Sequence, residues 1–315
     1  MVKNNTLTAS YYFKKAEKML EEQDLIGFME CIGSAKPLIK NNTSLLSKLD
    51  FLKAKGLYLF NNFEDALPAI EKALETNSGE EFLKLQEYQG LIYKEQGKFD
   101  KSIVNFKKIL EQIDNQESKV KFYINIGWVN LTGYEVENER KYLREAEEYL
   151  DLAEEVIEKR NSPHYKLLLL NYGDYYYKTG NYDKAIQFVE RAVKYCNKEE
   201  LPEIYNFLAE IHLAIDGVRL EEYLRKAEES AMKYDNDQEL AQVYYTRSQL
   251  EDKNEEWLKA IDSLYIALQH FMEANDYARA FKCFSKIIEL TKKFRDDCVI
   301  SFDSSMKKYF NKESF

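Results

Sequence analysis

Residue types that commonly carry out catalytic or metal chemistry are sparse in this sequence of 315 residues. Its three histidines, His164, His212 and His270, lie far apart and form no HxxxH or HExxH spacing. A zinc site needs histidine and cysteine ligands that are close in sequence or brought together by the fold, and the sequence indicates neither. The sequence also lacks a GxxxxGK[ST] phosphate loop and a GxSxG nucleophile turn. We therefore expect no catalytic residue, no metal and no cofactor, and an enzyme is the less favoured alternative.

Two further candidates have simpler interpretations than catalysis. Carboxylate pairs such as Glu147 and Glu148 are abundant, but on amphipathic helices such pairs usually form a solvated face. His212 occupies a position that other helices of the chain fill with an aromatic residue. We therefore expect His212 to be packed in a core or against a groove.

Two asparagines are better candidates for binding chemistry. Asn125 and Asn171 each stand two residues before a glycine, in N-I-G and N-Y-G. An asparagine amide can donate to a backbone carbonyl and accept from a backbone N–H, so it can bind an extended peptide without reading its side chains. The alternative is that each asparagine bridges neighbouring helices or faces water. The residues alone favour neither interpretation.

Helical hairpins must position these residues, and one stretch shows this most clearly. Residues 166–196, KLLLLNYGDYYYKTGNYDKAIQFVERAVKYC, are typical of two antiparallel helices joined by a turn at Gly180. The small residues Gly173, Ala185 and Ala192 let the two helices approach closely, while large residues fill the spaces between them. This order of small and large residues resembles the tetratricopeptide repeat, a helical hairpin of roughly 34 residues.

The same order of residues recurs along the chain. Hairpins are expected at residues 7–38, 45–76, 81–113, around Gly127 and Ala146, and at 166–196, 201–234 and 238–272. An eighth hairpin is expected from residue 276, with the last helix of the chain as its second helix. We therefore predict an all-α fold, a right-handed tetratricopeptide superhelix (an α-solenoid) of about seven to eight hairpins with a C-terminal capping helix. Its parts would be an atypical helix pair over residues 1–44, the repeat array over 45–290 and the capping helix over 291–315.

The fourth hairpin carries an insertion. In the third hairpin 12 positions separate Gly90 from Ser102, but 19 separate Gly127 from Ala146 in the fourth. The extra residues lie around Leu131 to Lys141 and would form either extra helical turns or a longer loop. Insertions of this kind map to one edge of a solenoid, which is often the binding edge.

Composition agrees with long helices and excludes several functional classes. The chain has 32% charged residues but only 11 glycines and 4 prolines, which favours helices. A net charge of −10 without a basic block argues against nucleic-acid binding, because phosphate recognition needs a basic face. The sequence shows neither a signal peptide nor a run of about 18 apolar residues, so we expect a cytoplasmic protein without a membrane partner. The scattered Cys31, Cys196, Cys283 and Cys298 are expected to be reduced thiols.

The two ends of the chain have alternative interpretations. A DNA-binding helix-turn-helix is the alternative for the first helix pair, although a third helix and a basic recognition helix are not visible. At the other end, Phe294, Cys298, Phe302, Met306 and Tyr309 form one apolar stripe at a spacing of about four. The last helix would then cap the final repeat, dock a partner or form a homodimer.

The resemblance to tetratricopeptide proteins implies a non-catalytic scaffold that binds a peptide or protein segment in its concave groove. The first helix of each hairpin lines this groove in that family. The residues that the resemblance places there are Tyr88, Asn125, Trp128, Asn171, Asp174, Tyr177, Asn206, Glu210, Tyr245 and Gln249. The acidic side chains among them favour a ligand with basic character.

A narrower resemblance is to the peptide-pheromone receptors of low-GC Gram-positive bacteria and their phages, such as the Rap regulators and arbitrium receptors. These proteins pair degenerate repeats with groove asparagines and end in a long helix. The resemblance implies an intracellular receptor for a signalling peptide that regulates a partner protein. The sequence departs from this family at its start, where neither a helix-turn-helix nor a three-helix bundle precedes the repeats.

Overall fold

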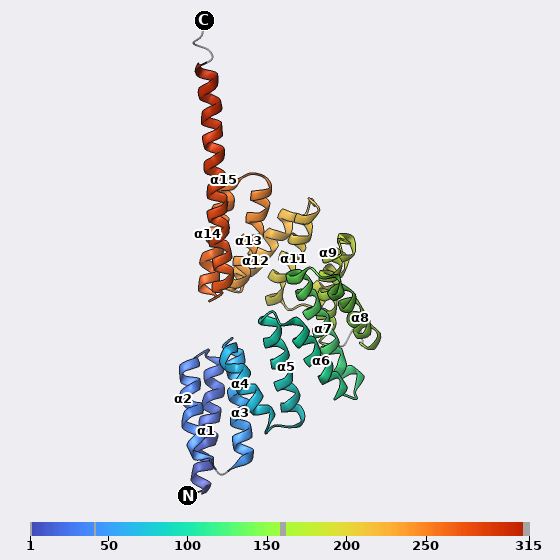
Figure 1. The fold of residues 1–315 in the computed structure, drawn as a ribbon, viewed down its shortest axis with the longest axis vertical. Coiled ribbons are helices and arrows are strands. Elements are labelled where there is room, and N and C mark those ends of the chain that lie inside the picture. The colour runs from blue at the N-terminus through green and yellow to red at the C-terminus, as the bar shows by residue number, and fades with distance from the viewer. Residues whose placement is uncertain (1, 41, 158–161, 311–315) are drawn as a thin grey trace. The chain divides into compact units, whose positions relative to one another are not determined.

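The computed structural model describes residues 2–40, 42–157 and 162–310, with side chains described over 7–40, 42–157 and 162–295. Within these residues every regular element is helical, with fifteen α-helices, three 3₁₀ helices and no strand. The all-α prediction is therefore confirmed. The chain forms two compact units, residues 1–164 (unit 1) and 165–315 (unit 2) (Figure 1).

Unit 1 consists of four helical hairpins in which the two helices of each pair pack against each other (Figure 1). Consecutive hairpins also pack in chain order, through α2 with α3, α4 with α5 and α6 with α7. The helices are α1 (Val2–Glu21), α2 (Leu25–Ala35), η1 (Lys36–Leu38), α3 (Thr43–Leu59), α4 (Phe63–Leu74), α5 (Gly79–Glu95), α6 (Phe99–Glu111), α7 (Gln116–Glu137) and α8 (Arg140–Val156).

Unit 2 consists of three hairpins followed by one long helix (Figure 1). Its second and third hairpins also contact each other through their first helices, α11 and α13. The helices are α9 (Tyr165–Lys178), α10 (Tyr182–Ala192), η2 (Val193–Tyr195), η3 (Lys198–Glu200), α11 (Leu201–Ala214), α12 (Leu220–Lys233), α13 (Asp237–Lys253), α14 (Trp257–Glu273) and α15 (Tyr277–Phe310).

The two helices of a hairpin approach closely where the first helix has a glycine. A Cβ atom added to Gly173 of α9 would lie only 2.5 Å from Val189 Cγ2 of α10. Gly90 of α5 and Gly127 of α7 lie in the same way against a large side chain of their partner helices. The expected function of the small residues is therefore confirmed: they leave room for the side chains of the second helix.

Each hairpin reverses direction through one residue in the left-handed region. Gly97 and Gly180 adopt φ values of 69° and 78°, as the repeated glycine predicted. The other five hairpins do without glycine at this point. They use Gln23, Asn61, Asn138, Asp216 and Glu255, with φ between 52° and 60°. The left-handed backbone conformation is thus common to all seven turns, whereas glycine is not. A search of the sequence for glycine therefore locates only some of the turns.

The insertion in the fourth hairpin extends its helices, so the loop alternative is wrong. Helix α7 has 22 residues where α5 has 17, and only two residues separate α7 from α8. The added turns are packed, because the buried Tyr142 of α8 lies against Gly133 and donates hydrogen bonds to Glu137 at 2.9 Å and Asp100 at 3.2 Å. The left-handed Asn138 then ends α7.

The end of the chain does not form the expected eighth hairpin. Helix α15 runs without interruption for 34 residues, so no turn precedes residue 291 and no separate helix begins there. The segment contains no glycine, proline or asparagine, the residues that usually end a helix. The side chains of Cys298, Phe302, Met306 and Tyr309 lie outside the described residues, so the apolar stripe predicted there stays a prediction.

Thiols and membrane segments can be assessed within the described part of the chain. No helix described there is both long and apolar enough to cross a membrane. Cys31, Cys196 and Cys283 are free thiols, and the side chain of Cys298 is not among those described. Burial raises the pKa of Cys196 and of Cys283 to about 11, so both thiols are protonated at neutral pH and react slowly.

The close approach at Gly173 gives a stability prediction. We expect Gly173→Ala to lower the free energy of unfolding by about 1–3 kcal/mol, because its methyl group would overlap the β-branched and fully buried Val189. As a control, Gly33→Ala in α2 adds a methyl group with no atom within 4 Å. It should raise stability by about 0.5–1 kcal/mol through helix propensity. Urea denaturation of the two variants measures both changes, and equal stability for both would contradict this account of the hairpin.

Candidate functional site

The predicted site residues of unit 2 lie on α9, α11 and α13, the first helices of its three hairpins. We call the residues that these helices present on their shared side the first-helix face of unit 2. The three helices are neighbours, because the ring of Tyr177 on α9 packs edge-on against Phe207 of α11, and α11 contacts α13 directly. Of the predicted residues, the structure brings Asn206 and Glu210 together most closely.

Glu210 is the centre of a hydrogen-bonded cluster between α11 and α13. Its Oε1 atom accepts from Asn206 Nδ2 at 2.9 Å and from Gln242 Nε2 at 3.1 Å. Thr246 Oγ1 lies 3.4 Å from the same atom and 3.1 Å from the backbone carbonyl of Gln242, so its one hydrogen is shared between the two acceptors. Burial raises the pKa of the Glu210 carboxyl above its ordinary value, and the three donors only partly offset this effect. We call these four residues the Glu210 cluster.

The cluster offers more hydrogen-bond acceptors than donors. Asn206 is only 3% exposed, and its Oδ1 atom accepts no hydrogen bond among the described residues. A buried carbonyl without a donor costs roughly 1–3 kcal/mol. A ligand group that donates there, such as a peptide N–H, an ammonium or a guanidinium, would remove this cost and also face the Glu210 carboxylate.

A second acidic group lies beside the cluster. Burial raises the pKa of Glu239 on α13 to about 7, and the nearby Glu203 and Glu210 raise it further, whereas Arg279 opposes the shift. Burial is therefore the main cause of this raised pKa, and the two neighbouring carboxyl groups add to it. Glu203, Glu210 and Glu239 thus place three carboxyl groups near one another on α11 and α13.

The predicted residues on α9 already have partners within unit 2. Asp174 pairs with Lys178, one turn later, at 2.6 Å, so part of its charge is neutralised. Tyr177 is half-buried, and burial together with Glu210 raises its pKa. Asn171 is half-buried beside Gly173. These residues border the Glu210 cluster, and Tyr177 also contributes to packing.

Tyr245 and Gln249 complete the predicted set on α13. Tyr245 is half-buried, and Lys282 Nζ lies 5.2 Å from the centre of its ring. Gln249 is exposed. It follows Gln242 by seven residues, so the two amides share one side of the helix.

The predicted residues of unit 1 have mixed surroundings. Tyr88 of α5 stacks on Tyr58 of α3 at 4.5 Å between ring centres, so it is a packing residue. Trp128 is 38% exposed, and Lys94 Nζ lies 3.6 Å from the centre of its ring, a cation–π contact that covers one face of the indole. Asn125 is half-buried, and its amide has no hydrogen-bond partner among the described residues. Of these residues, Asn125 therefore has the side chain most available to a ligand.

His212 is a packed core histidine, as expected. It is 7% exposed and stacks on Tyr223 at 5.3 Å between ring centres. Burial lowers its pKa and the nearby Arg219 lowers it further, so the ring is neutral at pH 7. Its packing against α12 explains why an imidazole occupies an aromatic position.

Three further residues of this site were not predicted from the sequence: Glu239, Gln242 and Thr246. The sequence does contain a signal for them, because these three residues and Gln249 follow one another at spacings of three, four and three residues. That spacing places all of them on one side of α13. The pattern is hard to recognise because these polar residues lie on either side of the small residues that mark the repeat.

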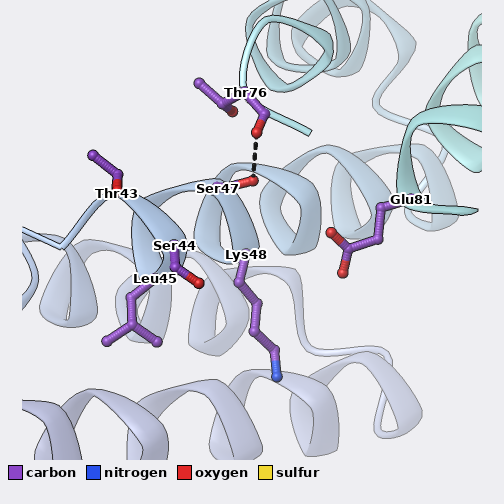
Figure 2. Close-up of a pocket in the computed structure, with 7 residues that line it drawn as sticks. All are labelled: Thr43, Ser44, Leu45, Ser47, Lys48, Thr76 and Glu81. Atoms are coloured by element: carbon purple, nitrogen blue, oxygen red, sulfur yellow. Dashed lines mark hydrogen bonds between the residues drawn. The ribbon is translucent and has the colours of Figure 1, made fainter. Parts of the chain in front are cut away.

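A separate pocket of about 520 Å³ lies in unit 1, at the start of α3 (Figure 2). Ser47 Oγ in its wall lies 3.0 Å from the carbonyl oxygen of Thr76 and 2.8 Å from Asn77 Oδ1, and its one hydrogen is shared between these two acceptors. This hydroxyl therefore joins α3 to the segment between α4 and α5. None of the predicted site residues lines the pocket, which is lined by Thr43, Ser44, Leu45, Ser47, Lys48, Thr76 and Glu81.

Known proteins show the same fold. Residues 167–199 match the family model described as tetratricopeptide repeat, and no curated protein matches the chain. A tetratricopeptide repeat protein from Parabacteroides merdae is similar with a TM-score of 0.59 and 16% identity, over 88% of this chain and 98% of its own. The apo form of RapI is similar with a TM-score of 0.67 and 12% identity, over 85% of this chain and 99% of its own. The apo form of the quorum sensor NprR from B. thuringiensis is similar with a TM-score of 0.58 and 14% identity, over 90% of this chain and 87% of its own.

At sequence identities of 12–16%, the similarity to these structures shows that the chain has the same fold. The prediction of a tetratricopeptide repeat fold is confirmed, and RapI is one of the Rap proteins that the sequence resembles.

The raised pKa of Glu239 gives a pH-dependent stability prediction. The folded-state pKa of Glu239 is about 7, whereas its ordinary value is 4.5. The protonated carboxyl therefore makes its full contribution to folding stability below pH 4.5, and this contribution is lost as the pH rises through 7. Glu239→Gln stays neutral at every pH. We expect it to raise the free energy of unfolding by about 1–2 kcal/mol at pH 8 and to change it little at pH 5.

Urea denaturation at the two pH values measures this difference. Glu229→Gln, on the exposed surface of α12, is the matched control and should show no such pH dependence. An equal effect of Glu239→Gln at both pH values would contradict the assignment.

Proposed function

We propose that this chain is a non-catalytic receptor or scaffold that binds an extended peptide or protein segment with basic character on the first-helix face of unit 2. The observation that carries the proposal is the Glu210 cluster, where a half-buried carboxylate lies beside the unpaired carbonyl oxygen of Asn206. A lysine or arginine side chain would pair with Glu210, while a peptide N–H or the same cation would donate to Asn206.

The chemistry of the cluster suits recognition. Its amide, hydroxyl and carboxylate groups hold one another in fixed orientations across two helices, so little side-chain freedom is lost when a ligand binds. The excess of acceptors selects for donors and against phosphate groups. This preference supports a peptide or protein partner rather than a nucleic acid.

The same face would serve a signalling peptide. The chain resembles RapI and the quorum sensor NprR in fold over most of its length, and both likenesses support the receptor role over that of a passive scaffold. We propose that the bound peptide regulates the contact of this chain with a partner protein inside the cell.

Asn125 and Asn171 are proposed to bind peptide backbone in their respective units. The amide of Asn125 has no partner among the described residues, and Asn171 stands at the same position relative to its glycine. Each would donate to a peptide carbonyl and accept from a peptide N–H. This contact would add affinity without adding sequence preference.

A binding experiment tests the peptide proposal. We expect the full chain to select peptides rich in lysine and arginine from a randomised library of short peptides. Glu210→Gln has the same shape without the charge, and it should weaken the selected peptides about tenfold or more, because a hydrogen bond to a charged group contributes about 1.5–3 kcal/mol. Affinity measured by calorimetry should also fall as the salt concentration rises.

The matched control for this experiment is Glu229→Gln, which makes the same charge change on α12, the second helix of its hairpin. It should leave the affinity unchanged. Selected peptides without an excess of basic residues, or equal binding by wild type and Glu210→Gln, would refute the proposal.

We also propose that a second copy of the chain packs on α15. Tyr277, Phe281, Phe284 and Ile288 are 44–69% exposed and follow one another at spacings of four, three and four residues. This is the spacing of a coiled-coil seam, and one such seam on each copy would form a self-complementary interface.

Disruption of this seam tests the homodimer. We expect the wild type to be dimeric in light scattering after size exclusion, and Phe281→Glu to be monomeric, because two buried carboxylates would face each other across the seam. Lys282→Glu also places a carboxylate on the exposed surface of α15, but Lys282 directly follows Phe281 and so lies on another side of the helix from the seam, and this variant should remain dimeric. A monomeric wild type would rule the interface out.

A further inference from the structure

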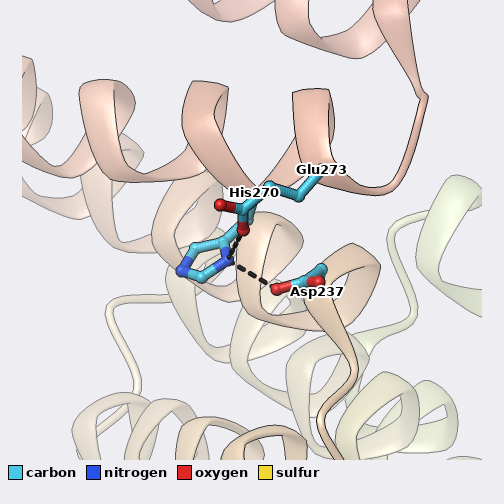
Figure 3. A group of neighbouring side chains, drawn as sticks. All are labelled: Asp237, His270 and Glu273. Carbon is cyan, nitrogen blue, oxygen red and sulfur yellow. Dashed lines mark hydrogen bonds and ion pairs between the residues drawn. The ribbon is translucent and has the colours of Figure 1, made fainter.

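Three side chains that commonly bind metals converge where α13 begins and α14 ends (Figure 3). Asp237 Oδ1 lies 2.8 Å from His270 Nδ1, and Glu273 Oε2 lies 3.3 Å from the same nitrogen. One ligand atom from each residue lies within 4.8 Å of those from the other two. Figure 3 shows both carboxylates directed at the same side of the imidazole ring.

Regular secondary structure holds the three residues in place. His270 and Glu273 are three residues apart in the last turn of α14, so they share one side of that helix. Asp237 is the first residue of α13, and the antiparallel hairpin places this end beside the end of α14. The side chain of Asn236 caps α13 by accepting from the Glu239 N–H at 3.1 Å, which fixes the backbone next to Asp237.

The charges of this group are not balanced by the protein. One ring N–H can donate well to only one of the two carboxylates that approach it. Among the described residues, no lysine or arginine lies within ion-pair distance of Asp237 or Glu273. Arg279, which follows soon after α14, pairs instead with Asp276 at 2.5 Å. A cation bound by this group would therefore face two carboxyl groups that pair with no lysine or arginine among the described residues.

We infer that Asp237, His270 and Glu273 bind a divalent transition-metal ion of the Zn²⁺, Ni²⁺ or Co²⁺ type. One imidazole nitrogen and two carboxylate oxygens form a mixed set that suits these ions better than Mg²⁺ or Ca²⁺, which prefer oxygen ligands alone. Asp237 and His270 are half-buried and Glu273 is exposed, so an ion can enter and water can complete its coordination.

The bound ion would connect α13 to α14 at the end of the last hairpin. Because the ligands come from both helices, its binding free energy adds to the stability of this hairpin. This site is separate from the Glu210 cluster, and its test does not depend on any peptide.

The test uses the full chain without a histidine tag, after treatment with a chelator. Calorimetry with Ni²⁺ should give one site per chain, and Ni²⁺ should raise the melting temperature. His270→Gln, Asp237→Asn and Glu273→Gln should each weaken binding by at least about tenfold, since even the hydrogen-bond partners of metal ligands contribute 10–100-fold. With Co²⁺, a visible absorption band should appear in the wild type and disappear in His270→Gln.

His164→Gln is the matched control, because His164 is also half-buried but has no carboxylate within ion-pair distance among the described residues. It should bind Ni²⁺ like the wild type. Glu273→Gln, at the exposed end of α14, keeps the test informative even if a change at His270 lowers stability. A wild type that binds no Ni²⁺, or equal binding by wild type and His270→Gln, would overturn the inference.

Discussion

The close approach of two helices at a small residue is the contact on which the rest of each hairpin depends. Where Gly90, Gly127 or Gly173 leaves out a side chain, a phenylalanine, leucine or valine of the second helix fills the space. Close packing of this kind fixes the spacing of the two helices, because a protein interior tolerates neither overlap nor voids. The left-handed residue in each turn fixes how the chain enters the second helix. Together these two features define one repeating unit.

Stacking of this unit creates the candidate site. Consecutive hairpins bring their first helices side by side, so Glu210 of α11 meets Gln242 and Thr246 of α13, which lie 32 and 36 residues further along the chain. No single helix contains the site. Its acceptors come together because each hairpin repeats the same geometry, which places equivalent surfaces next to one another.

Burial gives this surface its chemical character. Glu210 and Glu239 are partly shielded from water between α11 and α13, and the pKa of each rises mainly for that reason. The site therefore combines desolvated carboxylates with an amide oxygen that lacks a donor, an arrangement that favours cationic and N–H groups. The group of Asp237, His270 and Glu273 has the same origin, since the ends of two packed helices bring together charges that the sequence keeps apart.

The sequence by itself determined the fold class and the approximate limits of most hairpins. Patterns of small and large residues within a hairpin are local, so the hairpin around Gly173 was readable from about thirty residues. Tertiary structure decided the rest. Whether the residues after Leu131 form helix or loop depended on the packing of Tyr142, and α15 continues past residue 290 because no residue there interrupts it. Gln242 reaches Glu210 and Asp237 reaches His270 from a neighbouring helix, and a sequence pattern within one helix carries no information about which side chains meet across two.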